Sequence, residues 1–476
     1  MKTDIVSFKS ITSSTAIHRL DAPVHMTEGV LTRKLIAKSP YPLLTIKNVS
    51  QRVWHAGRWR RVYVTSPEHG VTLLGSSAIL KADLSWEKLI SRKYTQEQED
   101  KKLEKGWTLI SCSGTIGNCA FANAQHAEKL ASQHVIRLKP NNILRGGLVY
   151  AYLASKYGYA MLTQGTFGSV IQHIEPQNVE TIPIPSFPES FQQEIDDLIQ
   201  EAAKLREEAA EALEKAKQTL NTFINADFKK NNYKTSIVKS KCILTSLKHR
   251  LDPPALMNDG VFAMKEVTSR MPTEIIADIN AKVSRPGIFK RIYVENGIPY
   301  IKGSEIFLNN PFRRCEHLSR TRTPFIEEMT LYEGQILITC AGSVGNIKMI
   351  TKEYEDKEAI GSQDIIRLVS NDESFTKEYL FTYLQMPFVY DYIQSMKYGS
   401  VIERIEPFHI ESIPVVIPTK ELSEEVTSII RQYMDYTYRA FNAEEKAIHM
   451  VEQEIEKWNK HGELPKRAIQ LSKRSL

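Results

Sequence analysis

The chain has 476 residues, of which 42% are hydrophobic and 25% are charged. This is the composition of globular domains, so it excludes a collagen-like protein, a wholly disordered chain and a small disulfide-rich fold. The 62 Lys+Arg against 56 Asp+Glu give a formal net charge of +6, which favours a polyanionic partner without requiring one. The five cysteines form no Cys-x-x-Cys pair, so we expect neither a disulfide framework nor a structural zinc site.

The sequence contains no segment that predicts insertion into a membrane. No apolar run reaches the roughly 18 residues that a spanning helix needs. The first residues, MKTDIVSFKS, lack the apolar region of a secretory signal. We therefore expect a soluble, cytoplasmic protein without a membrane partner.

The sequence contains an internal repeat with a spacing of about 230 residues. Matching segments follow one another in the same order in both copies, which indicates a tandem duplication. The matches pair His18-Arg19-Leu20-Asp21 with His249-Arg250-Leu251-Asp252, Ser113-Gly114-Thr115-Ile116-Gly117-Asn118 with Ala341-Gly342-Ser343-Val344-Gly345-Asn346, Ser132-Gln133 with Ser362-Gln363, and residues 168–183 with 399–414.

Each copy predicts a β-rich α/β domain that is followed by one long helix. Short β-type runs such as 62–64 and 135–138 alternate with glycine turns, and prolines in 182–185 and 413–418 end the pattern. We therefore expect a first domain at 1–187, a central helix at 188–228, a second domain at 229–418, a distal helix at 419–460 and a basic tail at 461–476.

Apolar residues in the two predicted helices recur in alternating steps of three and four, which is typical of a seam for a partner helix. A single amphipathic helix more simply covers its own domain. Here the seam occurs in both copies, and each predicted helix, with about 35–40 residues, is more than 50 Å long. We therefore predict a two-helix spacer. The seam residues are Ile195, Leu198, Ala202, Leu205, Leu422, Val426, Ile429 and Tyr433.

The sequence offers no set of catalytic or cofactor-binding residues. Residues 251–255, Leu-Asp-Pro-Pro-Ala, resemble the Asp-Pro-Pro-aromatic motif of amino-methyltransferases, but Ala255 replaces the aromatic residue that stacks on a flipped base. No glycine-rich nucleotide loop and no metal-ligand spacing occurs. We therefore expect a non-enzymatic protein that itself holds no cofactor and no metal.

Basic residues interleaved with aromatic ones indicate DNA binding. Residues 52–63 carry four arginines and two tryptophans without an acidic residue. Arginine can bind a guanine edge or a phosphate through two hydrogen bonds, and aromatic rings can stack. Solvated basic loops are the alternative. The candidates are Arg52, Trp54, Arg58, Trp59, Arg60 and Arg61 in the first copy, and Lys290, Arg291, Arg313, Arg314, Arg320 and Arg322 in the second.

Glycine- and hydroxyl-rich loops supply the remaining candidates, and two interpretations stay open for them. The glycines can provide positive φ for tight turns, or the amides and hydroxyls can contact a phosphate. The candidate hydroxyls are Thr115, Ser169, Ser343 and Ser400. We further expect Arg19 and Arg250 to form an ion pair at the entry of each domain, and His173, His409 and the cysteines to serve packing.

The whole pattern resembles the specificity subunit of Type I restriction–modification systems. The resemblance is carried by the two Arg-Leu-Asp segments, by residues 298–306 (IPYIKGSEI), by the two Gly-x-x-Gly-Asn loops and by the Ile-Pro ends that lead into long helices. It implies two target recognition domains that each read one half of a bipartite DNA site. It also implies helices that pair as an antiparallel coiled coil, set the gap between the half-sites and dock two methyltransferase subunits.

The same resemblance implies a restriction and translocase subunit as a further partner. Adenosylmethionine, ATP and Mg²⁺ are then expected only on the partner subunits. Two alternatives stay open. In a stand-alone bipartite DNA-binding or defence protein, the apolar seams of the two helices would pack fully against each other and leave no surface for a third helix. A duplicated protein-interaction module would bind DNA with an affinity that is insensitive to salt, or not at all, whereas phosphate contacts make log affinity fall steeply with log salt.

Overall fold

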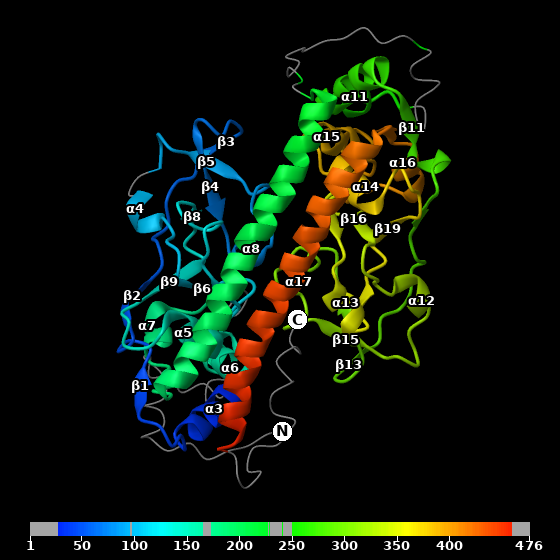
Figure 1. The fold of residues 1–476 in the computed structure, drawn as a ribbon. Helices are drawn as coiled ribbons and strands as arrows, with labels where there is room; N and C mark the ends of the chain where they lie inside the picture. The colour runs from blue at the N-terminus through cyan, green and yellow to red at the C-terminus, as the bar shows by residue number, and fades with distance from the viewer. Residues whose placement is uncertain are drawn as a thin grey trace. The chain divides into compact units, whose positions relative to one another are not determined.

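The computed structural model describes residues 27–458 apart from 96–97, 165–172, 227, 229–239 and 241–249. The chain divides into two compact units, of which unit 1 comprises Met1–Glu207 and Arg439–Leu476, and unit 2 comprises Glu208–Tyr438. Two long helices, α8 (Glu189–Ile224) and α17 (Lys420–Glu456), each contribute to both units (Figure 1). Arg19 and the expected tail at 461–476 lie outside the described residues.

The described residues of unit 1 form three small sheets and several short helices. Its strands are β1 (Leu43–Thr45), β2 (Ser50–Trp54), β3 (Tyr63–Val64), β4 (Gly70–Leu74), β5 (Leu89–Ser91), β6 (Thr108–Ser111), β7 (Cys119–Phe121), β8 (Leu130–Ala131), β9 (Val135–Pro140) and β10 (Pro183–Pro185). The helices are α3 (Glu28–Ile36), a 3-10 turn (Ala78–Leu80), α4 (Gln98–Lys101), α5 (Gly146–Ala154), α6 (Lys156–Gln164) and α7 (Pro176–Glu180). The sheets have the orders β2-β9-β6-β7, β3-β5-β4-β8 and β1-β10, and only β4 and β8 pair in parallel.

The domain of unit 2 repeats this architecture. Its strands are β11 (Thr273–Ile275), β12 (Ala281–Ser284), β13 (Tyr293–Val294), β14 (Ile298–Ile301), β15 (Glu316–Leu318), β16 (Ile336–Thr339), β17 (Ile347–Met349), β18 (Ile360–Gly361), β19 (Ile365–Ser370) and β20 (Pro414–Val416). The helices are α10 (Pro253–Met257), α11 (Asp259–Arg270), a 3-10 turn (Ile276–Asp278), α12 (Ile326–Met329), α13 (Lys352–Asp356), α14 (Lys377–Leu384), α15 (Pro387–Ser395) and α16 (Pro407–Glu411). The orders β12-β19-β16-β17, β13-β15-β14-β18 and β11-β20 match those of unit 1.

The two domains agree at the level of single hydrogen bonds. The Tyr152 hydroxyl donates to the Pro183 carbonyl at 2.6 Å, and the Tyr383 hydroxyl donates to the Pro414 carbonyl at 2.9 Å. These bonds tie α5 to β10 in one copy and α14 to β20 in the other. The prediction of two tandem domains of mixed α/β type is therefore confirmed.

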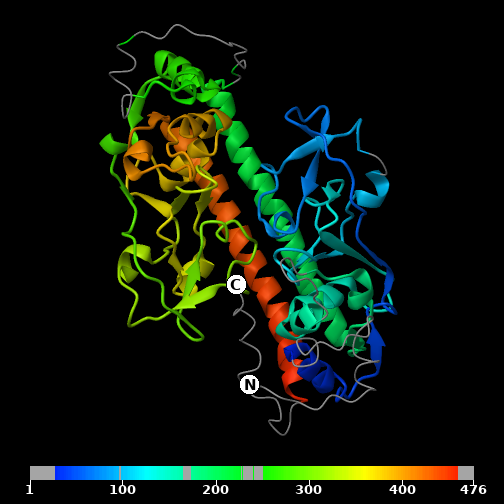
Figure 2. The same cartoon turned by 180° about the vertical axis from the view of Figure 1, so that it is seen from behind.

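The apolar core of each unit joins its domain to parts of both long helices. In unit 1, Ile195 of α8 and Val451 of α17 belong to one buried cluster with residues of α3 and α5. The views in Figure 1 and Figure 2 agree in placing α3 beside the C-terminal part of α17. In unit 2, Leu220 of α8 and Val426 of α17 share a cluster with α14 and α15.

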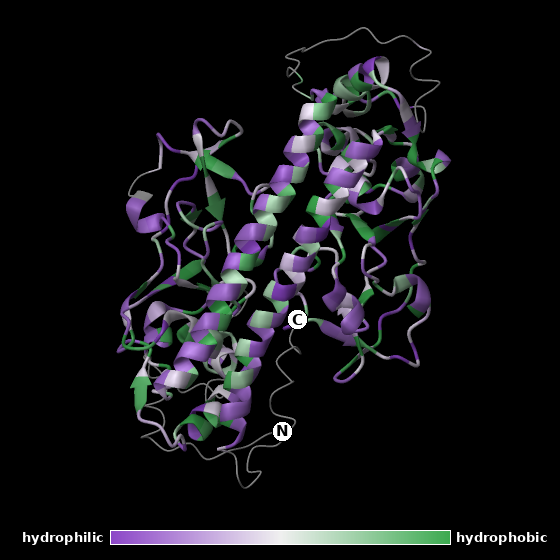
Figure 3. Cartoon of the chain, in the orientation of Figure 1, coloured by the Kyte–Doolittle hydropathy of each residue, from purple (hydrophilic) through white to green (hydrophobic). Residues whose placement is uncertain are grey.

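Polar and apolar residues alternate along α8 and α17, as Figure 3 shows. Of the eight predicted seam residues, seven are buried and Leu198 is partly buried. No helix among the described residues is both long and apolar enough to cross a membrane.

An arginine lies buried at the same position of each domain, Arg137 on β9 and Arg367 on β19. Arg137 donates to the carbonyls of Val135 at 2.9 Å and Lys101 at 3.3 Å, and also to Ala131. Arg367 donates to the carbonyls of Ile365 and Gly361. Burial lowers the pKa of each arginine to about 10, so both stay charged at neutral pH.

We expect Arg137→Leu to lower the free energy of unfolding by about 2–5 kcal/mol, because buried carbonyls lose their donor and each orphan costs about 1–3 kcal/mol. Urea unfolding followed by tryptophan fluorescence measures it, because Trp54 and Trp107 pack in this domain. The exposed Arg60→Leu is the control, with an expected change within about 0.5 kcal/mol. Equal midpoints for the two variants would contradict the prediction.

Candidate nucleic-acid interface

Four loop segments of unit 1 meet beside strand β6. The backbone N–H of Cys112 donates to the His134 carbonyl at 3.0 Å, and the N–H of Ile174 donates to the Cys112 carbonyl at 3.1 Å. Arg61, in the connection after β2, donates to the Gln133 side chain. The loop between β6 and β7, residues 132–134, residues 173–175 and residues 55–62 therefore form one surface, which we call loop cluster 1.

The glycines of the β6–β7 loop have a structural role. Gly114 and Gly117 have φ values of +79° and +77°, and a Cβ on Gly117 would lie 2.9 Å from the Tyr159 ring. The tight-turn interpretation is thus confirmed for these glycines. Thr115 between them is exposed, and its hydroxyl lies 2.9 Å from the Ser111 hydroxyl. The turn presents Thr115 at the surface, where it stays a candidate for phosphate contact.

Basic side chains converge on loop cluster 1. The pKa of His134 is lowered by burial, then by the positive charges of Arg61, His173, Arg58 and His55. The rings of His134 and His173 stack at 6.5 Å between centroids. A carboxylate is also present, because Glu175 lies 3.2 Å from His55 Nε2. A surface of this kind attracts an anionic ligand such as a DNA phosphate.

Unit 2 builds the corresponding surface, loop cluster 2, on the same backbone frame. The N–H of Cys340 donates to the Asp364 carbonyl at 3.2 Å, and the N–H of Ile405 donates to the Cys340 carbonyl at 3.0 Å. Gly342 and Gly345 again have positive φ, +72° and +85°. The two clusters therefore share one loop architecture down to the backbone hydrogen bonds.

The side chains on this shared frame differ between the two units. Glutamine and glutamate are kept at two positions, Gln133 against Gln363 and Glu175 against Glu406. At three positions the residue changes, so that His55 corresponds to Arg285, His134 to Asp364 and His173 to Arg404. In unit 2, Arg285 pairs with Glu406 at 2.8 Å, and Arg291 Nη2 lies 3.8 Å from Asp364. One frame thus presents two different patterns of donors and acceptors.

The predicted arginines of the first copy divide into two groups. Arg58 and Arg60 are exposed and Arg61 is half-buried, all on loop cluster 1 or its flank. Arg52 pairs with Asp100 at 2.7 Å and lies over the Trp54 ring.

The two predicted tryptophans of the first copy pack against the protein. Trp54 is buried, with its ring 5.1 Å from that of Trp107, so it serves the core instead of presenting a face to bases. Trp59 is half-buried against the cluster around Val71, and Lys101 lies over its ring at 5.0 Å.

The predicted residues of the second copy are dispersed. Arg291 belongs to loop cluster 2 and also donates to the Tyr300 hydroxyl at 2.8 Å. Exposed residues are Lys290, Arg320, Arg322, Ser343 and Ser400, whereas Arg313 and Arg314 are half-buried; Ser169 lies outside the described residues. For all of these, DNA contact stays a prediction.

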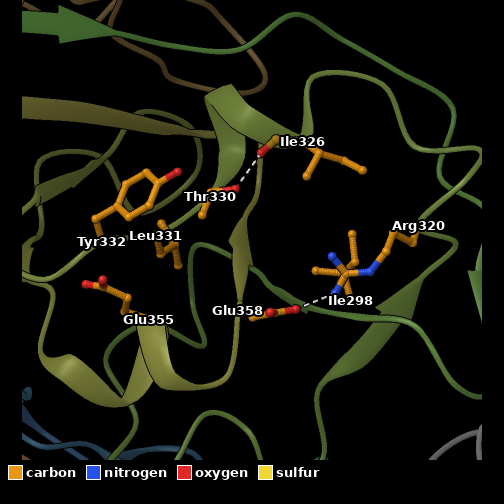
Figure 4. A pocket seen from close by; sticks show the side chains of 8 residues that line it. All are labelled: Ile298, Arg320, Ile326, Thr330, Leu331, Tyr332, Glu355 and Glu358. Carbon is orange, nitrogen blue, oxygen red and sulfur yellow. Dashed lines mark hydrogen bonds and ion pairs between the residues drawn. The ribbon is translucent and has the colours of Figure 1, made fainter.

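Arg320 lies at a pocket of about 300 Å³ in unit 2 (Figure 4). Its guanidinium pairs with Glu358 at 2.5 Å, and Glu355 also lines the pocket. Two carboxylates repel a phosphate, so this pocket is a poor site for the DNA backbone, which argues against Arg320 as a phosphate contact.

Sequence reasoning missed several members of the loop clusters: His55, His134, Arg285 and Arg404. A signal was present for two of them, because His134 directly follows the matched Ser132-Gln133, Arg404 lies inside the matched segment 399–414, and both differ from their counterparts in the other copy. His173 was expected to pack, but it lies half-buried in loop cluster 1. His409 is buried, and its Nδ1 accepts from the Glu406 N–H at 2.9 Å, as a packing residue does.

Other expectations concern single residues and metals. The predicted Arg250 ion pair is confirmed, since Arg250 Nε donates to Asp252 at 2.6 Å. Burial raises the pKa of Cys112 to about 12 and that of Cys340 to about 11, so both thiols are protonated and unreactive at neutral pH. Within the part of the chain that the structure describes, no three His, Cys, Asp or Glu residues gather to hold a metal ion.

The fold and the two loop clusters define a tandemly duplicated α/β protein with one candidate binding surface in each copy. A family model described as "Type I restriction modification DNA specificity domain" matches residues 75–218 and 276–449, which is more than half of the chain. The chain therefore belongs to the family of Type I restriction–modification specificity subunits.

The chain is similar to three solved structures. One is a Type-I restriction-modification S subunit from M. genitalium (12% identity, 88% of this chain and 96% of that chain, TM-score 0.33). Another is an HsdS subunit from Thermoanaerobacter tengcongensis (13% identity, 88% and 97%, TM-score 0.27). The third comes from a study of complex assembly and conformational transition of the type I R-M system (12% identity, 88% and 98%, TM-score 0.28). A comparison with curated proteins found no match.

Proposed function

We propose that this chain is the non-catalytic DNA-recognition subunit of a Type I restriction–modification complex, and that each of its domains reads one half of a bipartite DNA site. The observation that carries the proposal is the shared frame of loop clusters 1 and 2 with its different side chains. Two readers of unlike half-sites need this arrangement, because phosphate contacts position a protein while base-edge contacts specify the sequence. Arg58 and Arg61 act in one reader, and Arg285, Arg291 and Arg404 act in the other.

The long helices serve as the spacer in this proposal and pair as an antiparallel coiled coil. Direct contacts within each unit support it. In unit 1, Arg439 of α17 lies 3.8 Å from Glu201 of α8, and in unit 2 the Thr219 hydroxyl lies 3.5 Å from Glu425. Residue numbers thus rise along one helix while they fall along the other. The helices set the gap between half-sites and offer their outer faces to two methyltransferase subunits.

The chemistry of the complex resides on the partner subunits in this proposal. Adenosylmethionine is bound by the methyltransferase subunits, and ATP with Mg²⁺ by the restriction and translocase subunits. The present chain supplies only double-stranded DNA recognition and assembly.

Long-read methylation mapping of the host genome, with and without an in-frame deletion of the gene, tests the proposal. We expect the deletion to abolish methylation at one bipartite motif, and complementation with the full chain to restore it. An unchanged methylome in cells that express the partner methyltransferase would contradict the proposed function. The lost motif would also identify both half-sites, the gap and the methylated base.

A further inference from the structure

Three carboxylates in the C-terminal part of α17 accept hydrogen bonds from other parts of unit 1. Buried Glu444 accepts hydrogen bonds from the hydroxyl of buried Tyr150 and from Arg206. Glu452 accepts from the backbone N–H of Lys156 at 2.7 Å, and Glu454 accepts from the Tyr41 hydroxyl at 2.9 Å. Three carboxylates of α17 thus meet three donors of the domain and a fourth donor, Arg206, on α8.

In the described part of unit 2, the positions that align with the three domain donors carry no equivalent donor. The shared hydrogen bonds of the two domains align Tyr150 with Phe381, which has no hydroxyl. Lys156 opens α6, and its counterpart Pro387 opens α15. Proline has no N–H, so the first turn of α15 cannot donate at this position. Tyr41 aligns with Met271, which packs against the apolar core of unit 2.

The helix that packs on this surface of unit 2 is α8, and it differs from α17 at the polar positions. Its buried Ala216, Leu220 and Ile224 align with Ala447, Val451 and Ile455 of α17, so the apolar docking positions are kept. At the three polar positions, α8 carries Leu213 against Glu444, Asn221 against Glu452 and Phe223 against Glu454. Leu213 belongs to the same buried cluster as Phe381, and Phe223 packs against that cluster.

We infer that Tyr41, Tyr150 and Lys156 make the domain of unit 1 selective for α17 and against α8. If residues 208–224 of α8 packed on the domain of unit 1 in place of α17, the buried Tyr150 hydroxyl and the Arg206 guanidinium would lose the carboxylate of Glu444. If residues 439–456 of α17 packed on the domain of unit 2 in place of α8, Glu444 would lie against Phe381. Both exchanges bury a polar group or charge without a partner, which is costly.

This selection has a consequence for a duplicated chain. The two halves of the chain are alike, so the first halves of two copies could in principle pair through their α8 ends, and the second halves through their α17 ends. The polar contacts oppose both pairings and favour closure of each domain by the other half. The inference concerns assembly of the chain with itself and does not depend on DNA recognition.

Hydrogen–deuterium exchange on the full-length chain tests this selection. The variant Glu444→Leu, Glu452→Asn, Glu454→Phe gives α17 the residues of α8. We expect amide protection within 439–456 to fall about 100-fold or more, because breaking a buried charged pair costs several powers of ten in the opening equilibrium. Protection within 208–224 is expected to stay at the wild-type level.

A compensating variant separates selectivity from general destabilisation. Tyr41→Met, Tyr150→Phe, Lys156→Pro and Arg206→Thr, added to the triple variant, give unit 1 the residues of unit 2. We expect protection within 439–456 to return to within about tenfold of wild type. The reciprocal Leu213→Glu is expected to reduce protection within 208–224 alone.

Two outcomes would overturn the inference: wild-type protection of 439–456 in the triple variant, or a compensated variant no better protected than the triple one. If the triple variant does not fold, the single Glu452→Asn, at the edge of the contact, provides the same comparison against Lys156→Pro. Because no DNA enters the measurement, failure here leaves the proposed function untouched, and an unchanged methylome leaves this inference untouched.

Discussion

Replacement of Arg58, Arg60 and Arg61 by alanine is expected to abolish discrimination at one half-site and to leave the other half-site readable. All three belong to unit 1, and Arg58 and Arg61 act electrostatically on His134 in loop cluster 1. A bidentate arginine–base pair contributes about 1–3 kcal/mol of discrimination. Loss of one such contact therefore relaxes specificity at that half-site by roughly five- to 150-fold, and loss of a second relaxes it further.

Methylation mapping and competition binding with oligonucleotides mutated in either half measure this effect. Lys47→Ala is the matched control, because it removes an exposed positive charge from the same unit away from the loop cluster. Arg404→Ala in loop cluster 2 is the reciprocal variant and is expected to relax only the other half-site. A uniform loss across both halves in the triple variant would contradict the assignment of these arginines to one reader.

Insertion of seven residues into each long helix is expected to lengthen the gap of the DNA site while both half-site sequences persist. The insertions belong between Glu207 and Glu208 and between Tyr438 and Arg439, where each helix passes from one unit to the other. Seven residues keep the heptad phase and add about 10.5 Å of helix. This equals the rise of about three base pairs, so the gap is expected to grow by up to that number.

The change in gap is read from the methylated motif of cells that carry the elongated chain. Insertion into α8 alone is the control. It makes α8 longer than α17, so the two helices no longer match in register, and we expect a lower free energy of unfolding without a new gap. An unchanged gap with full methylation in the doubly elongated chain would remove the spacer role from the helices.

Because the chain is duplicated, the two loop clusters can be compared position by position. Their glycine turns and backbone bonds are the same, so loop architecture is common to both copies, whereas positions such as His134 and Asp364 differ in charge. A duplicated binding protein needs a constant scaffold with variable contact residues. The same principle applies at the helix ends, where Glu444 and Leu213 align on equivalent surfaces but suit different domains.

The sequence by itself determined the duplication, the order of domain and helix in each copy, and the family. These features depend on local patterns: matched segments, the three–four spacing of Ile195 or Val426, and glycines such as Gly117 that turns require. Local patterns also predicted the ion pair of Arg250 with Asp252, because the partners lie two residues apart.

Only the tertiary structure decided which basic and aromatic residues lie at a surface and which serve the core. Trp54 and Trp59 look alike in sequence. Trp54 lies on strand β2 against Trp107 and is buried, whereas Trp59 is half-buried. His134 and His173 are distant in sequence and meet because two loops are joined through Cys112. The contacts of Glu444 with Tyr150 and Arg206 likewise unite three distant segments. Burial and long-range contact depend on how sheets and helices pack, and spacing along the chain carries no record of that packing.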